Sequence, residues 1–93
     1  MTAFFLPVVE KSYQVYVLQN EQGKFYIGLS EDVDARLLQH NNGESKWTSK
    51  YRPWRMAWTS DAMLLSEARK LENKLKRAKG GNGFYAITGL ERK

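Results

Sequence analysis

Two tyrosines and an arginine follow one another at equal intervals in the first half of the chain. Tyr16 ends the short run 14–16, Tyr26 begins the run 26–28, and Arg36 comes ten residues after Tyr26. A phenol can donate or accept a proton, and a guanidinium binds phosphate through two parallel hydrogen bonds. If two adjacent strands and one helix carry these residues, the three side chains meet in one small region. Such a set is more typical of chemistry on a phosphodiester than of a purely structural domain.

The sequence around these residues predicts two strands and a helix. Residues 12–18 are rich in aromatic and β-branched side chains, and residues 24–29 repeat this composition after a polar turn, which favours a β-hairpin. Ser30 or Asp32 can cap the helix that follows, and Gly43 suits a left-handed conformation at its end. The two tyrosines and the arginine are therefore expected on neighbouring elements.

The second half of the chain predicts one more strand and a long helix. Residues 54–59 read as the third strand, and Asp61 or Ser66 is expected to open the second helix. Its buried stripe, at spacings of three and four, consists of Ala68, Leu71, Leu75 and Ala78. A glycine-rich break ends the helix, and the apolar residues 84–88 are expected to pack back on the domain. The predicted fold class is α+β, a small, three-stranded, mainly antiparallel sheet flanked by helices in the order β-β-α-β-α.

Length, charge and cysteine content narrow the class of protein. A chain of 93 residues predicts one domain over 1–93, with a core at about 13–79, an N-terminal arm at 1–11 and a C-terminal tail at 80–93. Fifteen basic and ten acidic residues give a net charge of +5, which favours a polyanionic partner. The absence of cysteine and the single histidine exclude disulfides and multi-histidine metal sites within one chain. No apolar run approaches the roughly 18 residues of a membrane span, so we expect a cytoplasmic protein without a membrane partner.

Several motifs, in their order along the chain, resemble those of the GIY-YIG nuclease superfamily. They are Gln-Val-Tyr at 14–16, without the usual glycine, Tyr-Ile-Gly at 26–28, the helix at 32–43 and Arg-Pro-Trp at 52–54. The helix carries the family's arginine as Arg36 and a histidine, His40, one turn later, and the family's metal-binding glutamate falls on Glu72. The chain is most similar to the small single-domain bacterial members. It is more distantly similar to the N-terminal nuclease domain of the excision-repair excinuclease and to structure-specific endonuclease subunits.

The resemblance implies an endonuclease that hydrolyses phosphodiester bonds in DNA with Mg²⁺ or Mn²⁺, in DNA repair or recombination. Glu72 would bind the metal, and one carboxylate is enough because Mg²⁺ usually keeps several waters. Arg36 would stabilise charge on the phosphate. Tyr16 would be the general base, which requires a lowered phenol pKa, and Tyr26 would support the water or the metal shell. His40 would be either an alternative base or a phosphate contact.

Each of these residues also has a structural interpretation. Tyrosines commonly pack within a sheet, and a histidine at the end of a helix interacts favourably with the helix dipole. Glu72 stands four residues before Lys76, a spacing that stabilises a helix through an ion pair. Many family members have an asparagine about a dozen residues after the glutamate, where this chain has Phe84, with Asn82 nearby.

Nucleic-acid binding is expected from basic residues interleaved with aromatic ones in the segment 46–55 and from the second helix. The candidates are Lys46, Lys50, Arg52, Arg55 and Lys76. The three tryptophans Trp47, Trp54 and Trp58 are expected in the core or at its rim. We expect weak, salt-sensitive binding of DNA with little sequence preference. RNA remains an open alternative. A homodimer would be one way to enlarge the surface that contacts the nucleic acid.

Two other hypotheses remain open on the same fold. One is a non-catalytic nucleic-acid-binding module, for which the basic and aromatic residues alone would suffice. The other is a structural or partner-binding domain whose tyrosines and arginine only pack. The sequence favours the nuclease because the chemical positions are all retained, namely Tyr16, Tyr26, Arg36 and Glu72.

Overall fold

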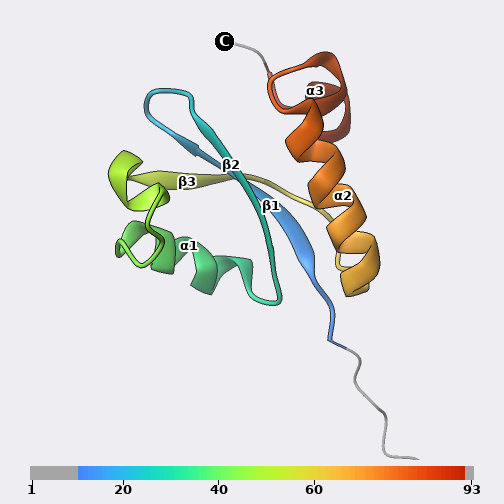
Figure 1. The fold of residues 1–93 in the computed structure, drawn as a ribbon, viewed down its shortest axis with the longest axis horizontal. Coiled ribbons are helices and arrows are strands. Elements are labelled where there is room, and N and C mark those ends of the chain that lie inside the picture. Colours follow the sequence, from blue (N-terminus) through green and yellow to red (C-terminus); the bar gives the residue numbers. More distant parts are fainter. Residues whose placement is uncertain (1–10, 92–93) are drawn as a thin grey trace, which may run out of the picture.

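Three antiparallel strands form the centre of the fold, and helices cover both faces of the sheet (Figure 1). The computed structural model describes residues 11–91. The strands are β1 (Gln14–Asn20), β2 (Phe25–Ser30) and β3 (Trp54–Thr59), in the spatial order β2-β1-β3. The predicted α+β class and antiparallel sheet are thus confirmed. The expected N-terminal arm lies, except for Lys11, outside the described residues.

The helices are α1 (Val33–Asn41), the 3₁₀ helix η1 (Thr48–Tyr51), α2 (Leu65–Ala78) and α3 (Asn82–Thr88). The apolar segment after the glycine-rich break packs back as expected, because Phe84 and Thr88 are buried. It does so as a helix, α3, which adds one helix to the predicted order. Across residues 11–91, no helix combines the length and the apolar character needed to cross a membrane.

The hairpin boundaries are set by the side chain of Asn20. Its amide oxygen accepts hydrogen bonds from the backbone N–H groups of Gln22 and Lys24, at 3.1 and 2.8 Å. This closes the turn inside residues 20–24, so β1 continues to Asn20 and β2 starts at Phe25. Both strands therefore end later than the sequence pattern suggested.

The start of α2 corrects the prediction of Asp61 or Ser66 as its opening residue. Met63 forms an isolated β-bridge with Tyr13, and the two residues exchange backbone hydrogen bonds of 2.8 Å in both directions. The bridge holds the backbone extended, and the helix begins only at Leu65, with Leu64 as an N-cap that provides no side-chain hydrogen bond. The predicted stripe is confirmed, since Ala68 and Leu75 are buried and the other two residues pack against the same core.

Alternate residues of β1 and β2 point to opposite faces of the sheet. On the face covered by α2 and α3, an apolar core consists of Val15, Val17, Phe25, Ile27, Ala68, Leu75 and Phe84. On the face covered by α1, the buried cluster consists of Tyr16, Leu18 and Trp54, with Tyr26, Val33 and Leu37 packed against it. The two tyrosines expected to do chemistry therefore share the α1 face.

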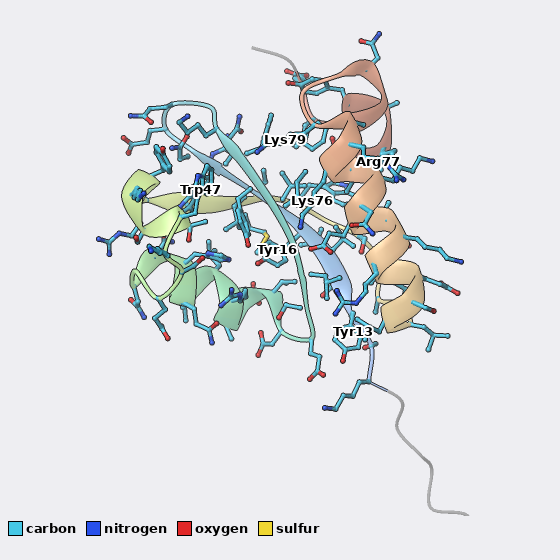
Figure 2. The ribbon with its side chains drawn as sticks, in the orientation of Figure 1. Tyr13, Tyr16, Trp47, Lys76, Arg77 and Lys79 are labelled. Carbon is cyan, nitrogen blue, oxygen red and sulfur yellow. The ribbon has the colours of Figure 1, made fainter. Side chains whose placement is uncertain are left out.

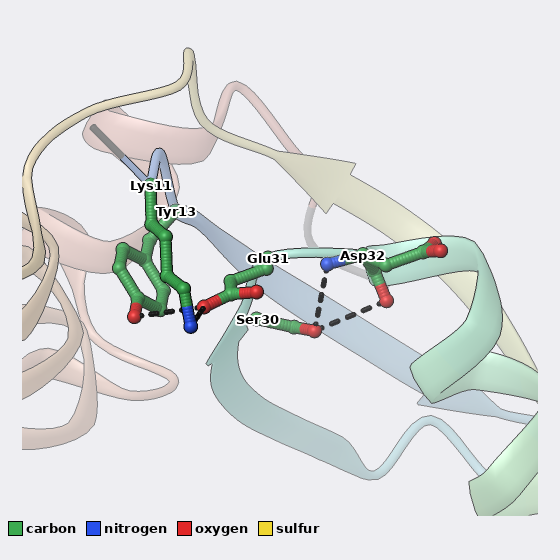
Figure 3. Close-up of polar contacts among 5 residues, drawn as sticks. All are labelled: Lys11, Tyr13, Ser30, Glu31 and Asp32. Carbon is green, nitrogen blue, oxygen red and sulfur yellow. Dashed lines mark hydrogen bonds and ion pairs between the residues drawn. The ribbon is translucent and has the colours of Figure 1, made fainter. Parts of the chain in front are cut away.

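Two sets of side-chain hydrogen bonds hold α1 against this face. At its start, Asp32 caps the helix by accepting from Ala35 N–H at 3.0 Å, while Ser30 bonds to the backbone of Asp32 (Figure 3). Glu31 accepts from the Tyr13 hydroxyl at 3.0 Å and pairs with Lys11 at 3.4 Å, which ties the turn before α1 to the start of β1 (Figure 3).

At the other end of α1, Asn41 bonds to both backbone groups of Trp54. Its amide nitrogen donates to the carbonyl oxygen at 2.9 Å, and its amide oxygen accepts from the N–H at 2.7 Å. Gly43 then ends the helix region with φ +82°, the left-handed conformation expected from the sequence. Because α1 is fixed at both ends, the residues between them have defined positions over the sheet.

Candidate active site

Tyr16 lies across Gly28, its direct partner in the β1–β2 register. A Cβ atom at position 28 would stand 2.5 Å from the Tyr16 hydroxyl oxygen and 2.6 Å from the ring carbon that carries it. The phenol therefore occupies the space that a side chain on β2 would fill. A glycine within a strand often marks a close approach of another group, and here Tyr16 itself makes this approach.

The Tyr16 hydroxyl starts a chain of buried hydrogen bonds. It lies 2.9 Å from Nε2 of His40, and Nδ1 of His40 lies 2.7 Å from the hydroxyl oxygen of Thr48. Thr48 also donates to the carbonyl oxygen of Ser45 at 3.4 Å, which assigns the proton of the imidazole to Nδ1. Nε2 is then the acceptor for the Tyr16 phenol. His40 is 0% exposed, and its Nε2 contact is with Tyr16.

Burial sets the protonation states of this pair. It lowers the pKa of His40 to about 4, and the nearby charge of Arg36 acts in the same direction, so the imidazole is neutral at pH 7. Burial also raises the pKa of Tyr16 to about 12, with Tyr26 and Glu72 adding to the rise and Arg36 opposing it. This is opposite to the lowered phenol pKa expected for a general base. The physical reason is that ionising a phenol costs more where water is excluded.

Tyr26 and Arg36 complete the α1 side of the site. The Tyr26 ring lies 4.8 Å from the His40 ring and 6.3 Å from the Tyr16 ring, measured between centroids. Arg36 projects from α1, where its guanidinium donates to the side-chain oxygen of Gln39 at 2.7 Å, and its charge favours ionisation of the Tyr16 phenol. One small region therefore contains two phenols, an imidazole and a guanidinium, as the residue spacing predicted.

Glu72 reaches the site from α2, on the other side of the β2 edge. Its side chain is 13% exposed, and its carboxylate pairs with Lys76 Nζ at 3.3 Å. The carboxylate also raises the pKa of the Tyr16 phenol, which places its charge within electrostatic reach of the site. Glu72 thus forms the ion pair of its structural interpretation, and its charge disfavours ionisation of the Tyr16 phenol. Among residues 11–91, no group of three or more His, Cys, Asp or Glu side chains comes together as a metal site.

Comparison with known protein families identifies this arrangement. The family model described as the GIY-YIG catalytic domain matches residues 12–85, which is most of the chain. The chain belongs to the GIY-YIG family. It is therefore a nuclease-family protein, and the domain implies that it binds nucleic acid.

Similar proteins include members of the group named UPF0213. One from Staphylococcus epidermidis is 36% identical over 63 residues, covering 67% of this chain and 77% of the relative. One from Staphylococcus saprophyticus is 32% identical over 69 residues, covering 73% and 83%, and one from Staphylococcus aureus is 35% identical over 66 residues, covering 70% and 80%. No solved structure matches the chain significantly.

In this GIY-YIG domain the basic residues expected to bind nucleic acid fall into different places. Lys76 lies at the site, beside Glu72. Lys46 and Lys50 are exposed in the segment around η1. Arg52 uses its guanidinium to bond the carbonyl oxygens of Ser49 and Asn41, and Arg55 bonds to Gln19.

Arg55 stands apart from the others. It pairs with Gln19, which alternates with Leu18 and so points to the face covered by α2 and α3. Arg55 also lies on β3, the edge strand opposite β2. The structure does not bring it to the tyrosine cluster of the GIY-YIG domain.

Sequence reasoning missed Thr48 and placed Trp47 only in general terms. Thr48 is fully buried and orients the imidazole of His40, yet a threonine eight residues after a histidine carries no recognisable signal. Trp54 is buried and Trp58 packs against the apolar core, as expected, whereas Trp47 is 41% exposed beside Tyr26. Asn82, the candidate for the family's missing asparagine, is the first residue of α3.

Proposed function

We propose that this GIY-YIG protein is a divalent-metal-dependent endonuclease that hydrolyses phosphodiester bonds in DNA. The observation that supports this most is the convergence on Tyr16 of two opposite charges from different helices. Arg36 of α1 and Glu72 of α2 both act on the same phenol, which Gly28 allows to lie at the β2 edge. A phosphate held by the guanidinium would thus lie next to both a proton acceptor and a carboxylate.

The hydrogen-bond chain supplies a route for the proton of the attacking water. The water oxygen forms the new bond to phosphorus, and the bond from phosphorus to the leaving oxygen breaks. The water proton moves to the Tyr16 oxygen while the phenol proton moves to Nε2 of His40, 2.9 Å away. Because the pKa of Tyr16 is about 12, a free phenolate would be rare at pH 7, and a concerted transfer avoids it. His40 is a positioning residue in this scheme, since it acts through Tyr16.

Arg36 and Lys76 would hold the phosphate. A guanidinium can contact two phosphate oxygens at once and stabilise the charge that accumulates on them as the bond to the leaving oxygen lengthens. Lys76 is 52% exposed at its side chain and already stands beside the site in its ion pair with Glu72. A bound phosphate offers this ammonium a second anionic partner.

Glu72 is the candidate ligand for Mg²⁺ or Mn²⁺. Its partly buried carboxylate fits a hard cation that takes one or two protein carboxylates and keeps several waters. When bound, such an ion polarises the phosphate and stabilises the leaving oxygen. Lys76 would have to release the carboxylate, which phosphate binding favours. The resemblance of the motifs to those of repair nucleases is the basis for proposing a role in DNA repair or recombination.

Cleavage of labelled nucleic acids tests the proposal. The panel contains single-stranded, duplex, flapped and branched DNA and an RNA strand, each incubated with Mg²⁺, with Mn²⁺ or with chelator. Glu72→Gln keeps the side-chain shape but removes its charge, and we expect cleavage to slow at least about a hundredfold while binding in chelator is retained. Glu67→Gln, an exposed carboxylate on the same helix, is the matched control and should cut like the wild type.

Arg36→Ala should slow cleavage by about 10²–10³-fold, as expected when a group that stabilises transition-state charge is removed. Cleavage that Glu72→Gln leaves intact would contradict the metal assignment. Wild-type protein that binds DNA but cuts none of the panel in either metal would favour the non-catalytic nucleic-acid-binding module instead. The raised pKa of Tyr16 favours this second candidate, because it disfavours Tyr16 as a general base.

A further inference from the structure

A groove continues from the tyrosine cluster along the outer edge of β2. Its first part has a volume of about 330 Å³ and is lined by Tyr26, Ile27, Trp47, Lys76 and Lys79. A second part, of about 480 Å³, shares Trp47 and Lys79 and extends past Lys24 to Tyr85 of α3. Both volumes lie in the range of about 300–1,000 Å³ that is typical of ligand pockets. The groove therefore begins at the proposed active site and leads away from it.

Trp47 forms the floor between the two parts of the groove. Its indole is stacked on the Tyr26 ring, with an interplanar angle of 27° and a centroid distance of 6.0 Å. Tyr51 and Trp54 support it from other sides, at 4.8 and 5.9 Å between centroids. Despite these contacts Trp47 is 41% exposed, a large exposed fraction for a tryptophan fixed by three aromatic neighbours. A rigid, partly exposed indole is a suitable surface for stacking a planar ring.

Lysines gather around this tryptophan. Nζ of Lys79 lies 5.8 Å from the centroid of the Trp47 ring, and Nζ of Lys24 lies 4.8 Å from that of Tyr51. Figure 2 shows Lys76 and Lys79 on the side of α2 that faces β2 and Trp47, whereas Arg77 points away. Burial lowers the pKa of Lys79, and the charge of Lys24 lowers it further. Keeping both ammonium groups charged at this place therefore costs free energy. A polyanion in the groove would relieve that cost.

Apart from its lysines, which can also contact guanine, the groove offers no groups suited to reading base pairs. Base edges in the grooves of a duplex are recognised through side chains such as Asn, Gln, Asp, Glu and Arg. The lining consists of aromatic, aliphatic and glycine residues and lysines, without an amide, a carboxylate or a guanidinium. A base can place its face on Trp47 only when it is not stacked within a duplex. The lining thus fits unpaired nucleotides with little preference among the bases.

We propose that this groove is a subsite for unpaired nucleotides next to the cleaved bond, with Trp47 as the stacking surface and Lys24, Lys76 and Lys79 as phosphate contacts. The inference rests on the proposed nuclease function and makes it more specific. The substrate class is nucleic acid with a single-stranded segment, such as a free strand or a flap.

The test measures binding in chelator, so that no cleavage is needed. Wild-type protein is titrated with an oligodeoxythymidylate and with an abasic oligonucleotide of the same length and charge, at several salt concentrations. We expect the thymidine strand to bind about tenfold or more tightly, since stacking of one base on an aromatic side chain can supply that difference. Trp47→Leu keeps an apolar side chain but has no aromatic face, and it should remove the preference while affinity for the abasic strand stays.

Lysine variants test the other half of the subsite. Lys79→Ala should weaken binding of both strands and reduce the slope of log affinity against log salt by about one. Arg77→Ala removes one positive charge from the same helix turn but outside the groove, and its binding should change less than that of Lys79→Ala. Trp47→Phe keeps an aromatic face at this position. If Trp47→Leu loses the thymidine preference because stacking is lost, Trp47→Phe should recover part of it. If the fold is disturbed instead, Trp47→Phe should not recover it.

Two outcomes would overturn the inference: a thymidine preference that Trp47→Leu retains, or wild-type protein that binds neither strand. Both are separate from failure of the nuclease proposal. A protein that cuts DNA in Mg²⁺ but shows no Trp47-dependent stacking is a nuclease without this subsite. A protein that shows the stacking but cuts nothing has the subsite without the proposed catalysis.

Discussion

Tyr16 and Val17 are neighbours in β1, yet their side chains belong to the two opposite faces of the sheet. Val17 lies in a core of apolar side chains with Phe25, Leu75 and Phe84. Tyr16 lies in a layer where the buried polar groups are joined by hydrogen bonds, and no buried side-chain N or O atom in the described part of the chain lacks a partner. The two faces share strands, but their stability depends on different forces. The face of Val17 depends on the exclusion of water and on close packing, and the face of Tyr16 depends on hydrogen-bond geometry and charge.

This difference indicates how a chain of 93 residues contains both a core and a polar site. Because strand residues alternate between faces, the same short strands supply both layers, and the helices on each face complete them. We therefore expect substitutions on the α2/α3 face to change mainly stability. Those on the α1 face should change mainly the protonation and position of Tyr16.

The largest expected effect on stability is that of Phe84→Ala on the apolar face. Phe84 is fully buried and its ring lies 4.8 Å from that of Phe25, so we expect a loss of about 3–5 kcal/mol in the free energy of unfolding, measured by urea denaturation. Leu38→Ala, an apolar deletion at an exposed position of α1, is the control and should change it by less than about 0.5 kcal/mol. Equal losses in the two variants would show that α3 is not part of the core.

Gly28→Ala tests the α1 face by steric means. The new Cβ would stand 2.5 Å from the Tyr16 hydroxyl oxygen, so the phenol must move away from His40, at an expected cost of about 1–3 kcal/mol and with loss of cleavage. The control is Gly83→Ala in α3, where the Cβ meets Ala78 Cβ at an ordinary 3.6 Å and where alanine should stabilise by about 0.4–1 kcal/mol. If Gly28→Ala cuts normally, the exact position of Tyr16 does not matter for the reaction.

The third effect is a pH dependence of stability that belongs to the α1 face alone. The pKa of His40 falls from 6.5 to about 4 on folding, so between these values the unfolded chain binds more protons than the folded one. Stability from this group is present above pH 6.5, declines as pH falls toward 4 and changes no further below that. At about 1.4 kcal/mol per pKa unit, we expect a decline on the order of 3 kcal/mol in wild type that is missing from the profile of His40→Gln. Parallel profiles for the two proteins would mean that His40 is not held neutral by burial.

Local patterns predicted much of the fold and brought the site residues to one place. The sequence predicted strands at 12–18 and 24–29 and the two tyrosines in one small region. The observed strands place both tyrosines on one face, because side chains alternate along a strand. Asp32 was one of two proposed caps for α1 and is the observed one. Such features depend only on neighbours in sequence, which is why they were accessible without a structure.

The features that sequence did not reveal depend on residues far apart in the chain. The late start of α2 follows from a backbone bridge between Met63 and Tyr13. The raised pKa of Tyr16 follows from burial under α1, whereas its role alone suggested a lowered one. The exposure of Trp47 depends on how its segment packs beside Tyr26. None of these has a periodicity or a motif that would identify it in advance.

The side chain of Asn20 has a mechanical consequence for the groove. Besides closing the hairpin, its amide nitrogen donates to the carbonyl oxygen of Tyr51 at 3.1 Å, while the Trp54 indole donates to that of Thr48 at 2.8 Å. These bonds join the hairpin tip, η1 and β3 into one stiff wall that carries Trp47. The opposite wall presents Lys76 and Lys79, whose unbranched side chains have more rotatable bonds than an indole held by three aromatic neighbours. We therefore expect the groove to adjust to strands of different bulk through these two lysines before it does so through the wall that carries Trp47.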